Sequence, residues 1–213
     1  MSNNKTHQMN HQPKESPGLR LEPDARRAHL LAIGASAFGA RAYDEVQIDQ
    51  VAELAGVSRG LLYHYFPGKQ AFFAAIIQEG FSDILKATSP NPALPPEAQL
   101  RASLQAYVDF VEQNPHIYRA LFRSAASALQ SIQEVVNHNL DQQAKRILHA
   151  LGPAAPNDPL LCLAVRAWLA FLIHAVLDWL DRSPKVDRQQ LIDVCMTTLQ
   201  SAVGASLSAA KTP

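Results

Sequence analysis

The segment DQVAELAGVSRGLLYHYFPGKQAFF, residues 49–73, has the clearest local structure in this 213-residue chain. It contains two stretches of helical character, each about eight residues long, with Gly56 between them. The glycine suits a tight turn, and Ala52 is small enough to let two helices approach closely. Val57 and Leu62 are apolar and can fill a core beneath the turn. This pattern is typical of a helix-turn-helix unit.

Helical periodicity continues on both sides of this segment, and nothing alternates with period two for long enough to require a strand. A helix capped by Asp24 is expected through ARRAHLLAIGASAFGARA, and its apolar stripe needs partners. Helices at about residues 48–55 and 59–66 supply them. The predicted core residues are Leu30, Leu31, Gly34, Phe38, Val51, Leu54, Ala55, Leu62 and Phe66. We therefore expect a three-helix domain over residues 23–68, followed by a connecting helix over residues 69–88.

The second helix of the helix-turn-helix is predicted to turn a polar and aromatic face away from the core. Ser58 is placed to cap its first turn, and Leu62 and Phe66 face inward. The outer positions are then Arg59, Gly60, Leu61, Tyr63, His64 and Tyr65. Such a helix is slim enough to enter a DNA major groove, and the fork of an arginine can pair with guanine O6 and N7. The face therefore predicts contact with double-stranded DNA.

The stretch QIDQVAELAGVSRGLLYHYF, residues 47–66, with the Lys69 and AFFAAI that follow it, resembles the DNA-binding region of the tetracycline-repressor (TetR) family. The similarity extends back through RRAHLLAIGASAFGARAYDE, so that it covers about residues 26–81. The resemblance implies a homodimeric, ligand-responsive transcription regulator, usually a repressor released from a palindromic operator by a small-molecule effector. A ligand-independent regulator and an activator are the alternatives.

The resemblance also implies roles for individual residues, carried over by position. Arg59, Gly60, Leu61 and His64 would approach bases, and Tyr63, Tyr65 and Lys69 would bind phosphates, which sets register and salt dependence. The complete expected DNA-binding set is Gln47, Ser58, Arg59, Gly60, Leu61, Tyr63, His64, Tyr65 and Lys69. The two tyrosines could instead pack on the next helix, and the histidine could be a solvated surface residue.

Two positions depart from the pattern of the family. Gln47 stands where a threonine is frequent, which puts the usual hydroxyl cap of the following helix in doubt. Ala42 stands where a glycine is frequent, so a left-handed turn there would carry a small strain.

Composition sets the limits of these predictions. Lysine plus arginine and aspartate plus glutamate number 19 each, so any affinity for DNA must come from a local face. Cys162 and Cys195 show no metal-ligand spacing and are expected to be buried thiols in a reducing cytoplasm. Residues 1–22 have no apolar run and are expected to be a disordered tail, whose Lys14 and Arg20 are either solvated or in reach of DNA. A membrane span over residues 160–180 is not expected, because three polar or charged residues interrupt it: Arg166, His174 and Asp178.

Five further helices are predicted after the proline-rich stretch at residues 88–98, over about residues 97–113, 115–129, 131–151, 160–181 and 187–207. The whole chain thus predicts about nine helices, with residues 97–209 as an effector-binding and dimerisation domain. The last two helices are apolar on two faces, which is expected if one face meets the core and the other a partner. The residues assigned to the dimer interface are Leu161, Val165, Leu172, Val176, Trp179, Ile192, Met196, Leu199 and Val203.

An effector cavity is predicted among the aromatic residues of this domain, because small-molecule sites combine apolar walls with a few polar groups. The candidate lining residues are Tyr107, Phe110, Tyr118, Phe122, Trp168, Phe171 and His174. They could equally fill a solid core. His174 and Asp178 lie one turn apart, but two residues without a third are a weak metal or acid–base site. No nucleophile with a base and no phosphate loop is apparent, so neither an enzyme nor a cofactor is expected, and an all-helical enzyme using this pair is the remote alternative.

Overall fold

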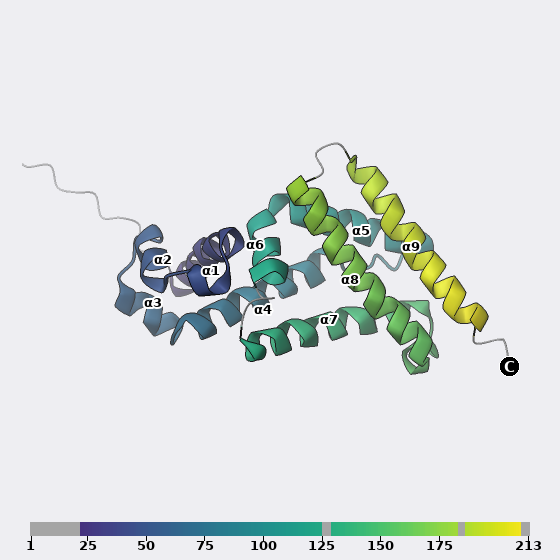
Figure 1. The fold of residues 1–213 in the computed structure, drawn as a ribbon, viewed down its shortest axis with the longest axis horizontal. Coiled ribbons are helices and arrows are strands. Elements are labelled where there is room, and N and C mark those ends of the chain that lie inside the picture. The colour runs from purple at the N-terminus through teal and green to yellow at the C-terminus, as the bar shows by residue number, and fades with distance from the viewer. Residues whose placement is uncertain (1–21, 125–128, 183–185, 210–213) are drawn as a thin grey trace, which may run out of the picture.

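The computed structural model describes residues 22–124, 129–182 and 186–209, and Figure 1 shows a small helical head at one end and a larger helical body at the other. No strand occurs within these ranges. The α-helices are α1 Pro23–Ala40, α2 Ile48–Leu54, α3 Arg59–Tyr65, α4 Lys69–Ala87, α5 Pro96–Gln113, α6 Pro115–Arg119, α7 Gln130–Leu151, α8 Pro159–Arg182 and α9 Arg188–Ala209. The predicted all-α fold of about nine helices is confirmed. Residues 1–21 of the predicted tail lie outside the described residues.

The helix-turn-helix forms as its local sequence predicts. Gly56 has a φ of +65°, a left-handed conformation that costs glycine little, and nothing lies within 4 Å of the place of a Cβ there. The backbone N–H of Val57 donates to the carbonyl of Ala52 over 3.0 Å and closes the turn. Ser58 then caps α3, because its hydroxyl accepts from the backbone N–H of Leu61 over 3.2 Å. The predicted serine cap is confirmed.

Two local predictions in the head, the Asp24 cap and a buried Leu54, were wrong, and the left-handed turn considered at Ala42 does not form. Helix α1 begins at Pro23 with Glu22 as its N-cap residue, so Asp24 lies in the first turn, where its charge still favours the helix dipole. Leu54 is 70% exposed, because α2 is only seven residues long and its inward face holds other apolar residues: Ile48, Val51 and Ala52. Ala42 has φ −63° and ψ 153°, so the chain turns there without left-handed strain.

Helix α4 connects the head to the body. Its apolar residues recur at helical spacing and are buried: Phe72, Phe73, Ile76, Ile77, Phe81 and Ile84. The end near the head packs against α1 at Gly34, where a Cβ would lie 2.3 Å from the tip of the Phe72 ring. Helix α1 also packs against α6, and there a Cβ on Gly39 would lie 2.3 Å from the carbonyl oxygen of His116. The head is thus docked on the body through close glycine contacts.

The body consists of α5 to α9, with α9 farthest from the head (Figure 1). Within the predicted helix over residues 115–129, α6 ends at Arg119 and a π-helical turn, Ala120–Ser124, follows it, while residues 125–128 lie outside the described residues. Helix α8 is long and apolar enough to cross a membrane by length and composition alone. It nevertheless packs against α7 and α9 and carries an exposed arginine, Arg166, as the core helix of a helical body does.

Candidate nucleic-acid interface and effector cavity

Helix α3 lies at the surface of the head and exposes the face predicted to meet DNA (Figure 1). Leu62 and Phe66 are buried and fix the opposite face in the core. Arg59, Gly60, Tyr63 and His64 are exposed, whereas Leu61 and Tyr65 are half-buried. Nothing lies within 4 Å of the place of a Cβ on Gly60, so the start of α3 can come close to another molecule.

Arg59 does not lie free on this face. Its guanidinium forms a 2.5 Å ion pair with a carboxylate oxygen of Asp49, in the first turn of α2. The other carboxylate oxygen is buried and has no hydrogen-bond partner within the described residues. Both side chains remain substantially exposed, so their attraction is screened by water. Asp49 therefore orients the arginine expected to read a base, and sequence reasoning missed this because the two residues lie on different helices.

The three aromatic rings on α3 have different surroundings. Tyr63 is 45% exposed, so part of its side chain is within reach of another molecule. Tyr65 is half-buried against the core, with its ring centroid 5.7 Å from that of His64 in an edge-to-face contact. His64 itself is exposed and has only this ring contact among those described. The outer face thus carries one aromatic hydroxyl and one imidazole.

Lys69 begins α4 directly beside the reading face. Its ammonium donates to the carbonyl oxygen of Asp44 over 3.1 Å and lies 4.7 Å from the centre of the Tyr43 ring. Partial burial lowers the pKa of Lys69, while the negative charge of Asp44 acts in the other direction. The remaining ammonium hydrogens can still bind a phosphate. Gln47 is exposed and its side chain makes no cap bond to α2, which agrees with the doubt raised by its sequence.

The body contains a cavity of about 80 Å³ between α4, α5, α7 and α8. Of the seven residues predicted to line a pocket, Tyr107, Phe122 and Trp168 do so. The residues that complete the wall are Phe81, Ile84, Thr88, Leu100, Ser103, Leu104, Leu140, Gln143, Arg146, Ile147, Leu169, Leu172 and Ile173. Sequence reasoning missed them because it searched for aromatic rings, and most of this wall is aliphatic.

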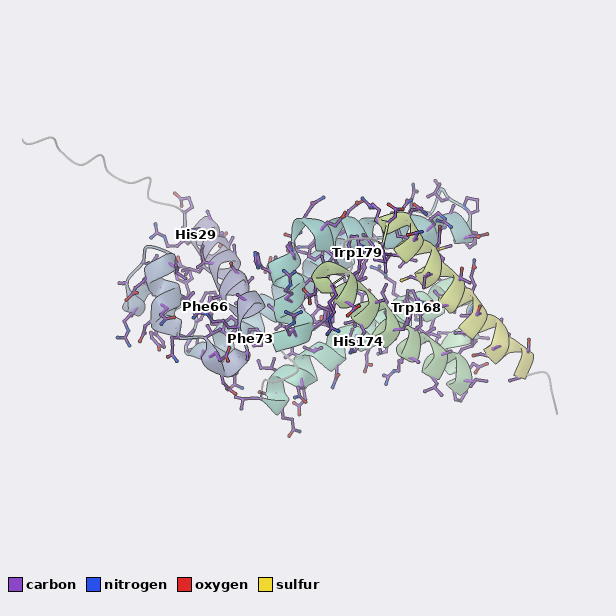
Figure 2. All side chains as sticks on the ribbon, turned by 45° about the horizontal axis from the view of Figure 1, so that its top comes forward. His29, Phe66, Phe73, Trp168, His174 and Trp179 are labelled. Atoms are coloured by element: carbon purple, nitrogen blue, oxygen red, sulfur yellow. The ribbon has the colours of Figure 1, made fainter. Side chains whose placement is uncertain are left out.

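The other four predicted pocket residues lie elsewhere. Phe110 and Tyr118 are buried but do not line the cavity. Phe171 and His174 lie on the exposed side of α8, where Figure 2 labels His174, and do not line this cavity; His174 lines a separate surface pocket with Phe122. Both were assigned on ring type alone, and helical position places them on the side of α8 that faces away from the core.

A pair of tyrosine hydroxyls lies beside the cavity. The hydroxyls of Tyr107 and Tyr118 are 2.7 Å apart, and that of Tyr118 donates to the carbonyl of Ile173 over 3.4 Å. Burial raises the pKa of both phenols. Both therefore stay neutral over the physiological range and serve as hydrogen-bonding groups rather than as charges.

The dimer interface predicted on α8 and α9 consists largely of residues that pack inside the protomer. Seven of its nine residues are buried within a single protomer and cannot meet a partner: Leu161, Val165, Leu172, Val176, Ile192, Met196 and Leu199. Trp179 and Val203 are half-buried against the same core. The prediction that both helices carry two apolar faces holds, because Leu163 and Phe171 on α8 and Val194 on α9 remain exposed.

His174 and Asp178 do not form a joint site. An imidazole nitrogen of His174 lies 2.9 Å from the carbonyl oxygen of Ala170, and Asp178 pairs with Arg182 over 3.3 Å. No cluster of three or more metal-ligating side chains occurs in residues 22–124, 129–182 and 186–209. Of the two cysteines, Cys195 is buried as predicted and Cys162 is only half-buried.

Both the head and the body of the chain match models of known protein families. A family model described as "Bacterial regulatory proteins, tetR family" matches residues 30–76, and one described as "Tetracyclin repressor-like, C-terminal domain" matches residues 96–201. The HTH-type transcriptional regulator BetI of Pseudomonas aeruginosa is 30% identical over 166 residues, which are 72% of this chain and 84% of BetI. The HTH-type transcriptional activator FasR of Mycolicibacterium smegmatis is 32% identical over 114 residues, which are 50% of each protein. The chain thus spans about half the length of FasR and of similar curated relatives.

Solved structures agree with these matches. The tetR-family transcriptional regulator from Streptomyces coelicolor has a TM-score of 0.73 and 28% identity, with 89% of this chain and 85% of that protein covered. A TetR-like transcriptional regulator from Rhodococcus sp. RHA1 has a TM-score of 0.71 and 24% identity, with 87% and 99% covered.

Proposed function

This chain belongs to the TetR family of bacterial transcriptional regulators and is a DNA-binding regulator, and we propose that it is a homodimeric repressor released from a palindromic operator by a small molecule. Its place of action would be the cytoplasm. The observation that carries the proposal is the face of α3, on which Arg59, Tyr63 and His64 are exposed while Leu62 is fixed in the core. Contacts from this face would specify bases, and Lys69 beside it would hold a phosphate.

The exposed face of α8 and α9 supports dimerisation. Leu163 is 64% exposed, Val194 52% and Phe171 38%, which leaves apolar area in water on a single protomer. Small residues on the same side, including Ala167 and Ser201, allow another pair of helices to approach closely. A two-fold axis through this face would make a four-helix interface. It would also present two α3 helices to successive major grooves, spaced about 34 Å apart.

The cavity supports regulation by a small molecule, because α4 forms part of its wall. Phe81 and Ile84 of α4 line the cavity, and so does Thr88, the C-cap residue of the helix. The same helix begins at Lys69, directly after α3. An effector that binds one position of α4 more tightly would change the position of the heads. Relatives of this chain are named as an activator, FasR, and as a repressor, DhaR, so a transcription assay decides between activation and repression.

Selection of binding sequences from a randomised pool of duplex DNA tests the proposal. The full-length protein is expected to enrich a palindrome whose half-sites lie one helical turn apart. Arg59→Ala should relax preference at one base of each half-site, whereas Arg101→Ala, on α5, should leave the enriched sequence unchanged. Absence of enrichment at low salt, or an asymmetric single site, would contradict the proposal.

The oligomeric state is tested separately by sedimentation at micromolar concentration. The wild type is expected to be a dimer and Leu163→Glu a monomer. Leu54→Glu is the matched control, because Leu54 is also an exposed leucine but lies on α2, in the head. A dimer that survives Leu163→Glu would place the interface elsewhere.

A further inference from the structure

The cavity in the body has a single charged residue in its wall, Arg146 of α7. Thr88, Ser103, Gln143 and the hydroxyl of Tyr107 are the other polar groups among its described lining residues. The rest of the wall is aliphatic or aromatic. A cavity with an apolar wall and one guanidinium favours an apolar molecule that carries one negative charge.

The guanidinium of Arg146 is held by neutral partners rather than by a carboxylate. It donates to the carbonyl oxygens of Leu85 over 3.0 Å and Thr88 over 2.7 Å, and to the Thr88 hydroxyl over 2.6 Å. No acidic side chain of the described residues forms an ion pair with it, unlike the arginines on the protein surface such as Arg101 and Arg188. Burial lowers the pKa of Arg146 for the same reason, because no opposite charge offsets the desolvation.

Arg146 also lies where the cavity meets the outside. It lines, together with Thr88, Leu100, Ser103 and Ile147, a neighbouring groove of about 360 Å³ between α5, α7 and α9. The groove includes one acidic side chain, Glu97, which accepts a hydrogen bond from Gln200 over 3.4 Å. A molecule that enters from the groove therefore reaches the guanidinium at the mouth and the apolar wall behind it.

We propose that the effector is a small apolar carboxylate, with its anion bound by Arg146 and its hydrocarbon part in the cavity between α4, α5, α7 and α8. Guanidinium and carboxylate match in geometry and can form two parallel hydrogen bonds. The volume of about 80 Å³ is roughly half that of an apolar cavity that holds benzene, so the buried part is short, on the order of four carbon atoms. This proposal rests on the proposed function as an effector-released regulator.

Binding of such an anion would act on α4. The carbonyls that Arg146 now binds belong to the last turn of α4 and its C-cap residue, Thr88, where a cation stabilises the helix end. A carboxylate competes for the same guanidinium hydrogens. Occupancy therefore loosens the end of α4 in the body, and α4 begins beside the reading face of the head.

Titration of the full-length protein with butanoate and hexanoate, and with 1-butanol and 1-hexanol as neutral counterparts, tests the charge requirement. Trp168 lines the cavity, so its fluorescence reports binding independently of calorimetry. The acids are expected to bind at least tenfold more tightly than the alcohols. Arg146→Met should remove that preference and leave the affinity for the alcohols unchanged, and Arg101→Met on α5 should change neither.

Gln143→Glu is a second variant, in which Arg146 itself is retained. It adds a carboxylate to the cavity wall and should abolish the preference for acids by occupying the guanidinium. The carboxylate assignment would be overturned if acids and alcohols bound equally well, or if acid binding were unchanged in both variants. It would also be overturned if neither acid bound with a Kd below about 10 mM, which is the range of a weak ligand. A palindromic operator would still support the regulator. Conversely, acids that bind as expected without weakening operator binding would leave the site intact and refute effector release.

Discussion

Replacing Gly39 by alanine should weaken the docking of the head on the body. A Cβ at this position would lie 2.3 Å from the carbonyl oxygen of His116, 2.8 Å from its Cα and 2.9 Å from its carbonyl carbon. All three are backbone atoms of α6 and cannot rotate away. The contact must widen by roughly 1 Å to reach ordinary van der Waals separation.

The size of the effect follows from two opposing contributions. Overpacking of a close contact costs about 1–3 kcal/mol, and alanine recovers up to about 1 kcal/mol through its better helix propensity. We expect a net loss of about 1–2 kcal/mol in the free energy of unfolding. For a chain of this size that lowers the Tm by about 2–8 °C. Operator affinity should fall as well, because α1 is part of the head.

Thermal unfolding followed by circular dichroism measures this change. Gly60→Ala is the matched control for stability, because Gly60 is also helical and nothing lies within 4 Å of the place of its Cβ. That variant should melt at or above the wild-type temperature. A Gly39→Ala protein with the Tm of the wild type would refute the reasoning, because the contact between α1 and α6 would then have room for a methyl group.

Three further changes can be tested together. Lys69→Ala should weaken binding to all DNA sequences and lower the slope of log affinity against log salt by about 0.9 per protomer. Arg59→Ala should instead mainly alter the preference at one base. Identical behaviour of the two variants in salt titrations would contradict these roles. Tyr118→Phe leaves the buried hydroxyl of Tyr107 without its 2.7 Å partner and should cost about 1–3 kcal/mol in chemical denaturation. Because burial raises the pKa of both phenols, the folded protein keeps protons that the unfolded chain loses, so wild-type stability should decline as the pH rises above about 10 and the tyrosine variant should decline less. Burial raises the pKa of Cys195 to about 11, so Ellman's reagent at pH 8 should label it only after denaturation; rapid labelling of two thiols in the native protein would show that it is accessible.

The head was predictable because its determinants are local. Gly56 supplies the left-handed turn and Ser58 caps α3, and both act within four residues of their own positions. The exposed face of α3 then follows from helical periodicity once Leu62 is placed inside. Leu54 failed the same reasoning, because in a helix of only seven residues an apolar side chain near the end need not face the core.

The body was less predictable, because its contacts join distant segments. Helical periodicity shows that α8 has two apolar stripes but gives no reason to assign either of them to the partner. The stripe with Val165 and Val176 is buried in the protomer, and the stripe with Leu163 and Phe171 is exposed. Arg146 was missed for a related reason, because its hydrogen-bond partners Leu85 and Thr88 lie 61 and 58 positions earlier in the sequence.

Helix α4 joins the two functional parts by direct packing. Near its start, the ring of Phe72 lies 4.8 Å from that of Phe66, the residue that ends the reading helix. Near its other end, Arg146 binds its last carbonyls at the mouth of the cavity. Its 19 residues span roughly 28 Å at 1.5 Å per residue. The proposed effector contact at one end and the reading helix packed at the other would thus act on one continuous helix, which can carry a coupling free energy between the two sites.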